Sequence, residues 1–126
     1  IRIDPEPSNA ELGALSRGAW GGGDANDWTP ILARSLVHLG AYDGERLVGF
    51  ANVAWDGGVH ATILDTMVHP DYGRQGIGTD LVRQATRVAR ERGAHWLHVD
   101  YEPHLTSFYE ACGFRPTTAG LINLRQ

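Results

Sequence analysis

The sequence contains no lysine, only one cysteine and no long apolar run, and each of these absences excludes a class of protein. All eleven basic residues counted as Lys or Arg are arginines, so the P-loop motif, which needs Gly-Lys-Ser/Thr, is excluded. A single cysteine forms no intramolecular disulfide, which favours a reducing, cytoplasmic setting. No stretch approaches the ~20 apolar residues of a membrane span, and no charged-then-apolar leader is visible at the N-terminus, so nothing suggests secretion.

The length and the charge of the chain further limit the classes of protein to which it can belong. The 126 residues fit one domain, which we expect to span 1–126. The hydrophobic share of 42% and the charged share of 21% are ordinary for a globular soluble chain. A net charge of −4 disfavours a general nucleic-acid binder, which usually shows a basic face. We therefore expect neither a nucleic-acid partner nor a membrane partner.

Turn and capping signals organise the first half of the chain. Ser8 and Glu11 begin a helix, because a Ser oxygen accepts from the free amides of a first turn. Asp43-Gly44 and Asp56-Gly57-Gly58 are strong hairpin signals. The elements expected here are a strand at 1–4, a helix reaching about 20, a helix opening at Thr29-Pro30, and strands at 39–42, 47–55 and 61–68. These strands should form an antiparallel meander.

After Gly76, the spacing between apolar residues becomes that of a helix. Apolar residues recur every three or four positions up to Ala89, and Gly93 ends the helix as a left-handed cap. A strand at 96–99 then implies a right-handed crossover and a parallel pair. A short helix closed by Gly113 and a last hairpin, 114–116 with 121–124, complete the prediction. The fold class is α/β, a mixed α+β sheet whose meander is followed by one parallel step, with a crevice at that step.

The most informative stretch is the glycine-rich turn at 68–79, between a strand and a helix. Free amides and the helix dipole at such a helix start bind anions, and Gly76 and Gly78 let a phosphate approach the backbone. The alternative is a plain chain reversal. The spacing Gly-x-x-Gly-x-Gly of Gly73, Gly76 and Gly78 does not match the dinucleotide fingerprint, which disfavours a Rossmann-type nucleotide-binding domain.

This stretch resembles the acyl-CoA signature of the GNAT superfamily of N-acetyltransferases. Val68 and Pro70 match a strand end of the form Val-x-Pro, and Gly76 and Gly78 match the two small positions of Gln/Arg-x-x-Gly-x-Gly/Ala. A second block, Phe108-Tyr109-Glu110-Ala111-Cys112-Gly113-Phe114, looks like the family's aromatic-Tyr-x-x-x-Gly-Phe motif. The resemblance covers about 39–116. Two departures stand out: Gly73 replaces the usual Gln or Arg, and the turn 101–104 lacks an Asn often found there.

The resemblance implies a GNAT-like fold that binds acetyl-CoA as cosubstrate and transfers its acetyl group to an amine by direct attack. The pantetheine arm would lie along the end of the strand at 61–68 like an added strand, and a backbone amide of that strand would hold the developing oxyanion. The expected cofactor-binding residues are Met67, Val68, Arg74, Gln75, Gly76, Ile77, Gly78 and Thr79. A homodimer is the oligomeric state that the resemblance suggests.

The resemblance also places a tyrosine. Tyr109 stands at the family's general-acid position, although core packing beside Leu105 is the alternative. A neutral-pH amine must lose a proton before it attacks, and Asp65, Glu102 and Asp100 are the candidate bases. For each of these carboxylates an exposed or capping role is the competing interpretation.

Several other residues could have a functional role, but each also has a simpler structural explanation. His95 and His98 face opposite ways on a strand, so no metal site is expected. Cys112 lies on an apolar helical face and is expected to pack as a small hydrophobe. Three tryptophans either wall an acceptor pocket or fill the core: Trp20, Trp28 and Trp55. An acidic cluster either attracts a small cationic acceptor or is a solvated face: Asp4, Glu6, Glu11, Asp24 and Asp27.

A second class of function is a non-catalytic module that binds coenzyme A or an acyl-CoA as a sensor. Tyr109 argues against this module, whereas Gly73 and the missing Asn are compatible with it. The acceptor amine is not identified by the sequence, and polyamines, aminoglycosides, amino acids and protein N-termini all stay open.

Overall fold

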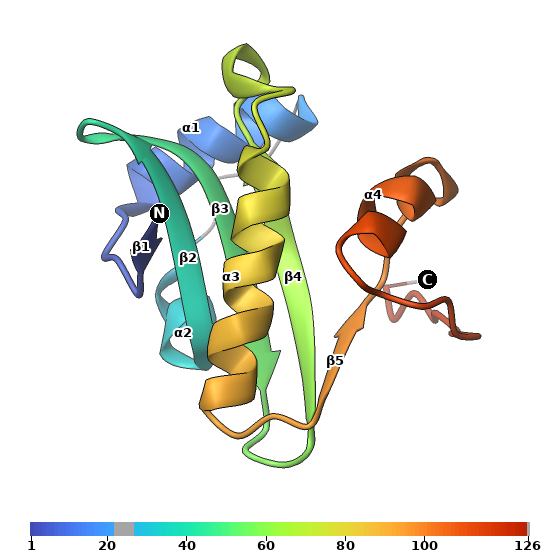
Figure 1. The fold of residues 1–126 in the computed structure, drawn as a ribbon. Helices are drawn as coiled ribbons and strands as arrows, with labels where there is room; N and C mark the ends of the chain where they lie inside the picture. The colour runs from blue at the N-terminus through green and yellow to red at the C-terminus, as the bar shows by residue number, and fades with distance from the viewer. Residues whose placement is uncertain (22–26, 126) are drawn as a thin grey trace.

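One five-stranded sheet with helices on both of its faces forms the frame of the molecule (Figure 1). The computed structural model describes residues 1–21 and 27–125. The elements run β1 (Arg2–Ile3), α1 (Asn9–Trp20), α2 (Thr29–Ala33), β2 (Ser35–Asp43), β3 (Arg46–Trp55), β4 (His60–Val68), η1 (Pro70–Tyr72), α3 (Ile77–Glu91), β5 (Trp96–Val99), η2 (Pro103–Leu105) and α4 (Thr106–Ala111). Within these described ranges, no helix has the length and apolar character that crossing a membrane requires.

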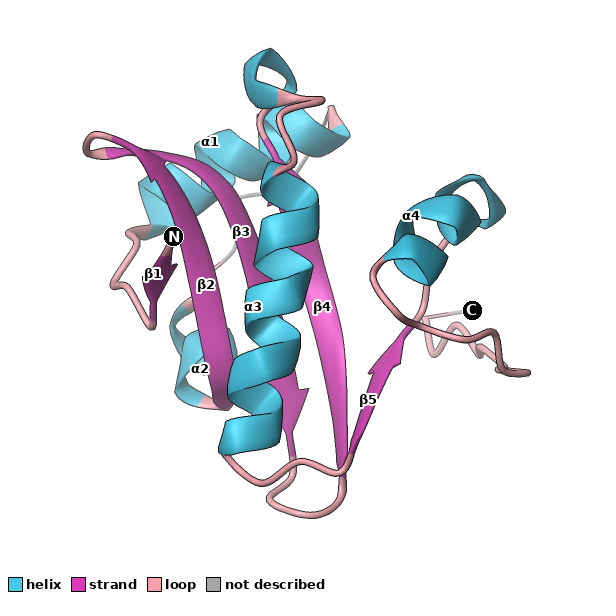
Figure 2. Cartoon of the chain, in the orientation of Figure 1, coloured by secondary structure: helices cyan, strands magenta, loops and turns pink. Residues whose placement is uncertain are grey.

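The strands lie in the sheet in chain order, β1-β2-β3-β4-β5. Successive strands from β1 to β4 pair antiparallel, and β4 pairs parallel with β5. Gly44 and Gly57 turn the two hairpins with φ of 60° and 90°, values that glycine adopts without strain. The predicted fold class, an antiparallel meander followed by one parallel step, is confirmed (Figure 2).

Helix α3 makes the parallel step possible because it returns the chain from the end of β4 to the start of β5. Its period of three and four residues gathers the apolar side chains on one buried face: Leu81, Val82, Ala85, Val88 and Ala89. These side chains pack against the inward residues of the sheet, among them Val37, Leu39 and Ile63. Gly93 follows the helix with φ of 109°, as expected of a left-handed cap.

The opposite face of the sheet is covered by α1 and α2 (Figure 1). Ser8 and Glu11 form the predicted capping box, in which each residue's backbone N–H donates to the other's side chain at 2.9 and 3.1 Å. Leu12 and Leu15 of α1 bury against Phe50 and Met67. The core is therefore divided by the sheet into two clusters, one under α3 and one under α1.

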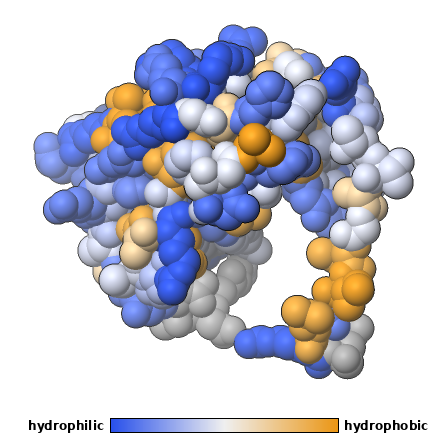
Figure 3. All heavy atoms as spheres, turned by 90° about the horizontal axis from the view of Figure 1, so that it is seen from below, coloured by the Kyte–Doolittle hydropathy of each residue, from blue (hydrophilic) through white to orange (hydrophobic). Residues whose placement is uncertain are grey.

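The predicted last hairpin is wrong. Residues 114–125 contain no strand, and their apolar side chains stay in solvent, with Leu121 88%, Ile122 81% and Leu124 91% exposed. Figure 3 shows hydrophobic residues standing away from the body of the molecule across an open gap. A strand needs a partner for its backbone groups, and this segment has none within the described protomer. The strand predicted at 39–42 begins earlier, at Ser35, because Ser35 pairs with Ala54 near the end of β3.

We predict that Leu81→Ala lowers the free energy of unfolding by about 2–5 kcal/mol, because Leu81 is fully buried between α3 and the sheet. Urea denaturation followed by far-UV circular dichroism measures the change. Arg90→Ala, on the exposed face of the same helix, is the matched control and should stay within about 0.5 kcal/mol of the parent. Equal stabilities for the two variants would contradict the assigned helix face.

Candidate active site

Strands β4 and β5 part before β4 ends. Their parallel register runs from His60 opposite Trp96 to Ile63 opposite Val99, whereas β4 continues to Val68. Past Ile63, β4 has no partner on this side among the described residues, and α4 lies across the divergence from α3 (Figure 1). A crevice is predicted from the sequence at this divergence, and it stays a prediction.

A β-bulge interrupts β4 just past the last residue that pairs with β5. Asn52 lies opposite Leu64 and Phe50 opposite Met67, so β4 has two residues, 65 and 66, where β3 has one. Asp65 takes a left-handed φ of 57°, a region in which Asp is enriched among non-glycine residues. A bulge leaves a backbone group unpaired and re-aims side chains, and bulges are over-represented next to active sites.

The Asp65 carboxyl group is half-buried at this bulge. Burial raises the pKa of Asp65 above its ordinary value of 3.8, because the ionised form loses water that no other charge replaces. A carboxylate with a raised pKa is a stronger proton acceptor at neutral pH than an exposed one.

Tyr109 is brought to the same part of β4 by α4. The residue is 6% exposed, stacks on Tyr101 with ring centroids 4.9 Å apart, and meets Phe108 and Phe114 edge-on. Burial raises the pKa of Tyr109, and the Thr66 hydroxyl beside the phenol opposes the rise. Since Thr66 belongs to the bulge, the phenol and the bulge lie together.

The two other candidate bases are placed differently. Glu102 and Asp100 are exposed on the turn between β5 and α4. Glu102 precedes η2 and makes no capping hydrogen bond there. The structure therefore brings Tyr109 and the Asp65 bulge together and leaves the other two carboxylates on the surface.

The turn before α3 has the geometry of an anion site. Gly76 is the N-cap of α3 with φ of 80°, and no side chain caps the helix. A Cβ built on Gly76 would meet nothing within 4 Å, so the space beside the cap is open. The first-turn amides at 77–79 are consequently free for an anion, and the helix dipole favours one there.

Gly78 serves packing. A Cβ on Gly78 would lie 3.3 Å from Cζ of Phe108 and 3.7 Å from Cγ2 of Val68, tighter than an ordinary contact to the ring. The missing Cβ at Gly78 was expected to make room for a phosphate. On this side of Gly78, however, the Phe108 ring occupies that space. This contact joins the first turn of α3 to α4, the helix that carries Tyr109.

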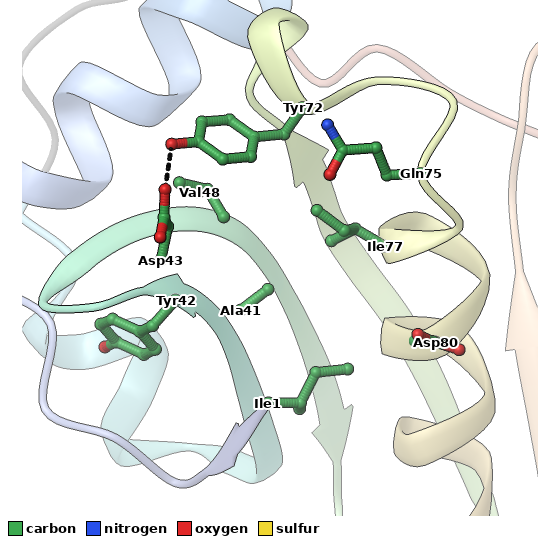
Figure 4. A pocket seen from close by; sticks show the side chains of 9 residues that line it. All are labelled: Ile1, Ala41, Tyr42, Asp43, Val48, Tyr72, Gln75, Ile77 and Asp80. Atoms are coloured by element: carbon green, nitrogen blue, oxygen red, sulfur yellow. Dashed lines mark hydrogen bonds between the residues drawn. The ribbon is translucent and has the colours of Figure 1, made fainter.

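The remaining residues expected to bind the cofactor divide by orientation. The Met67 side chain is 1% exposed, in the core under α1, so only its backbone is open to a ligand. Val68 and Ile77 pack on the α3 side of the sheet. Arg74 is exposed and takes a left-handed φ of 62°. Gln75 lines a hollow of about 380 Å³ on the β2–β3 side of the turn (Figure 4).

A set of side-chain contacts holds this turn to the β2–β3 hairpin, and these contacts were not predicted. The Tyr72 hydroxyl donates to Oδ2 of Asp43 at 2.6 Å (Figure 4). Nη2 of Arg46 lies 3.3 Å from Nε2 of His69, and its guanidinium lies over the Tyr72 ring at 5.5 Å. Asp43 signalled only a hairpin in the sequence, because side-chain contacts across 29 residues leave no local pattern.

The other residues with competing interpretations have structural partners. His98 contacts His60 on β4, with Nδ1 of His60 and Nε2 of His98 2.8 Å apart. In the described part of the chain, no three His, Cys, Asp or Glu side chains gather as metal ligands would. Burial raises the pKa of the half-buried Cys112 thiol, which keeps it neutral and poorly nucleophilic.

The tryptophans and the acidic cluster are mostly structural. Trp28 is buried and meets Phe50 edge-on at 5.9 Å, the Trp55 indole donates to a backbone carbonyl, and Trp20 is 54% exposed. Three acidic residues are engaged in local contacts: Asp4 with Arg92, Glu11 with Ser8, and Asp27 with Asn9 and Thr29. Asp24 lies outside the described residues.

Comparison with known proteins finds N-acetyltransferases among the proteins similar in sequence to this chain. An uncharacterized N-acetyltransferase, ycf52, from Porphyra purpurea is 38% identical over 69 residues, which are 55% of this chain and 40% of that protein. The chain spans less than half the length of this and similar relatives.

Solved structures resemble the whole described fold. A Staphylococcus aureus protein of unknown function has a TM-score of 0.83 at 21% identity, with 97% of each chain covered. A GNAT family acetyltransferase from Streptococcus pneumoniae has a TM-score of 0.81 at 26% identity, with 98% of this chain and 96% of that chain covered. The family model described as the acetyltransferase (GNAT) family matches residues 11–114. The chain belongs to the acetyltransferase (GNAT) family.

Proposed function

We propose that residues 1–126 form a single domain that transfers an acetyl group from acetyl-CoA to an amine, with Tyr109 as general acid and Asp65 as general base. The observation that carries this proposal is the burial of the Tyr109 phenol beside the bulge in β4. The bulge supplies a half-buried carboxyl group one residue from the hydroxyl that lies against the phenol. Both proton carriers therefore come from one short segment and the helix that packs on it.

The residues around the divergence fit acetyl-CoA, which supplies the acetyl thioester. The open cap at Gly76 and the free amides at 77–79 suit a pyrophosphate. Beyond Ile63, the edge of β4 that β5 leaves unpaired offers backbone groups to an extended pantetheine arm as a partner strand would. Arg74 and Gln75 are exposed beside the turn. Met67 contributes through its backbone, since its side chain is buried.

Two proton transfers accompany the proposed reaction. The amine nitrogen attacks the thioester carbon, and Asp65 takes the proton that the amine loses. A backbone amide freed by the bulge stabilises the negative charge that develops on the carbonyl oxygen. As the carbon–sulfur bond breaks, Tyr109 donates its phenolic proton to the departing thiolate. Because burial raises the pKa of both groups, the carboxylate accepts a proton more readily and the phenol stays protonated at neutral pH.

A second candidate function rests on Gly73, which stands where the family usually has Gln or Arg. A domain that binds coenzyme A weakly through this turn would serve as a sensor without turnover. The two functions are distinguished by following free thiol with a chromogenic reagent while an amine panel is supplied with acetyl-CoA. Thiol release that depends on the amine supports the enzyme, whereas binding without release supports the sensor. It stays a prediction that the acceptor is an amine, and so does the cytoplasmic location.

We predict that coenzyme A at about 100 times its dissociation constant stabilises the protein by about 2.7 kcal/mol in a thermal melt. Gly76→Ala should lose most of this shift, because alanine disfavours the left-handed cap that exposes the amides. Gly57→Ala is the matched control, with φ of 90°, equally open space and a remote position. It should lower the melting temperature but keep the shift. An unchanged melting temperature at millimolar coenzyme A would contradict the proposed site.

We predict that Tyr109→Phe lowers the turnover number by about 10²–10⁴, since it keeps the ring and removes only the proton donor. The coenzyme A shift and the melting temperature should hardly change. Tyr101→Phe, which removes only the hydroxyl of the ring stacked on Tyr109, should stay within a few-fold of the parent rate. Turnover of the Tyr109 variant at the parent rate would make Tyr109 a packing residue only.

We predict that Asp65→Asn also lowers turnover by about 10²–10⁴, whereas Glu102→Gln does not. In the parent, the rate should fall as the pH drops through the raised pKa of Asp65. The free energy of unfolding should instead rise as the pH drops through this range. The folded state holds the Asp65 proton more tightly than the unfolded state, so this residue costs stability above its raised pKa. Asp65→Asn should therefore be the more stable protein at pH 7, with the advantage shrinking toward pH 4.

Those measurements also test the assignment of the base. Asn tolerates the left-handed conformation of position 65, so the backbone is expected to survive the substitution. A Glu102→Gln variant that loses the acidic limb of the rate profile, beside an Asp65→Asn variant that keeps it, would move the base to Glu102.

A further inference from the structure

The turn between β4 and α3 does not hold its own backbone in place. Among the described residues, the amides of 74–79 donate no backbone–backbone hydrogen bond. Arg74 takes φ of 62° and Gly76 takes φ of 80°. A positive φ at a residue other than glycine is uncommon and persists where the surrounding structure enforces it. The orientation of these amides is therefore set by contacts from outside the turn.

The end of the turn that enters α3 is fixed by close packing. A Cβ built on Gly49 of β3 would lie 3.0 Å from Cδ1 of Leu81 and 3.1 Å from Cγ2 of Ile77. Because Gly49 has no side chain, α3 packs tightly against the sheet at this point. The first residues of the helix are thus held by the core.

The start of the turn borders a hollow instead of a packed core. The hollow measures about 380 Å³, and Tyr72 and Gln75 of the turn line it together with Asp43 and Val48 of the β2–β3 hairpin (Figure 4). Space of this kind lets a neighbouring segment shift, because fewer packed atoms oppose the movement. Side-chain contacts across the hollow then decide where the turn lies.

Four side chains make those contacts, and we call them the clasp: Asp43, Arg46, His69 and Tyr72. The Tyr72 hydroxyl donates to Oδ2 of Asp43 at 2.6 Å, a short hydrogen bond to a carboxylate oxygen. This hydrogen bond raises the pKa of Tyr72, so the phenol stays a donor at neutral pH. The Arg46 guanidinium lies over the Tyr72 ring at 5.5 Å, and its Nη2 lies 3.3 Å from Nε2 of His69.

The clasp is attached to regular secondary structure. The His69 backbone N–H donates to the carbonyl of Val48 in β3 at 2.8 Å. On the other side, a Cβ built on Gly18 of α1 would lie 3.4 Å from Cδ2 of His69 and 3.7 Å from Cδ of Pro70, so α1 supports the start of the turn. The sheet and α1 thus fix His69, and the bond from Tyr72 to Asp43 fixes the segment that follows it.

The support of this segment matters because of what the turn offers to an anion. Gly73 brings no side chain, so the backbone amides at 74–79 are a main source of hydrogen-bond donors. Amides contribute most to affinity when they are already aimed at the acceptor before it binds. A turn that shifted into the hollow would have to be reordered by the ligand, at a cost in affinity.

We propose that the clasp positions the turn, and that the Tyr72–Asp43 hydrogen bond holds the amides of 74–79 in the orientation that binds the pyrophosphate of acetyl-CoA. Tyr72 and Asp43 are then positioning residues, because they act through the turn. This inference rests on the proposed function, which supplies the anion. It adds that the affinity for the cosubstrate depends on a hairpin outside the turn itself.

A double-mutant cycle tests the bond. Tyr72→Phe keeps the ring beneath Arg46 and removes the donor, and Asp43→Ala removes the acceptor. In isothermal titration calorimetry, each should raise the dissociation constant for coenzyme A about tenfold. The double variant should bind no more weakly than either single variant, because all three lack the same bond. Asp43→Asn keeps an acceptor oxygen and a strong hairpin signal, so it should recover most of the affinity.

A truncated acetyl donor separates positioning from a general loss of structure. S-acetylpantetheine has the thioester but no pyrophosphate, so its kcat/KM should be equal in the parent and in Tyr72→Phe. For acetyl-CoA, kcat/KM should fall about tenfold through KM, with kcat unchanged. Tyr42→Phe is the matched control, because Tyr42 precedes Asp43 in β2 and its hydroxyl donates to no described residue. The control should keep the parent affinity.

Three results would overturn the proposal. Unchanged affinity in both Tyr72→Phe and Asp43→Ala would remove the positioning role alone, since the parent would still bind coenzyme A and the proposed function would stand. Equal losses with acetyl-CoA and S-acetylpantetheine would show that the clasp supports the whole fold rather than the anion turn. A parent that binds no coenzyme A at millimolar concentration would overturn the positioning role and the proposed function together.

Discussion

Two residues of β4 lie opposite one residue of β3, and the arrangement of the candidate active site depends on that mismatch. The extra residue forces Asp65 into a left-handed conformation and frees a backbone group. It also coincides with the point where β5 leaves the sheet, just past Ile63. Without the extra residue, the alternation of side chains would continue unbroken, and the residues of β4 after the bulge would change faces.

Burial acts on Asp65 and Tyr109 by the same physical cause. Removing water disfavours the charged form of each group, so the pKa of Asp65 and the pKa of Tyr109 both rise. The raised pKa gives the Asp65 carboxylate a higher affinity for a proton. The raised pKa of Tyr109 keeps its phenol protonated at neutral pH. Burial thus favours both of the roles proposed for these residues, and no third charged group is needed to separate them.

The sequence predicted those parts of the fold whose signals are local. The capping box at Ser8, the Asp-Gly hairpins and the period of α3 each act within a few residues, and the structure has all of them. The bulge at Asp65 was not predictable, because it depends on which residues of β3 stand opposite. The contact of Gly78 with Phe108 and the bond of Tyr72 to Asp43 are equally long-range. The last hairpin was expected from apolar residues alone, and such residues make a strand only where an edge accepts them.

The absence of lysine has a consequence for the proposed reaction with an acetyl thioester. An amine near an acetyl thioester is itself an acetyl acceptor, and a lysine beside the anion turn would compete with the substrate. Two arginines lie at that turn: Arg74 is exposed on it, and the guanidinium of Arg46 lies against His69 and Tyr72. A guanidinium stays protonated and supplies hydrogen bonds and charge without offering a free nucleophilic nitrogen. Among these 126 residues, every positive side chain besides histidine is of this kind. These residues therefore offer no lysine amine that would compete with the acceptor in the proposed reaction.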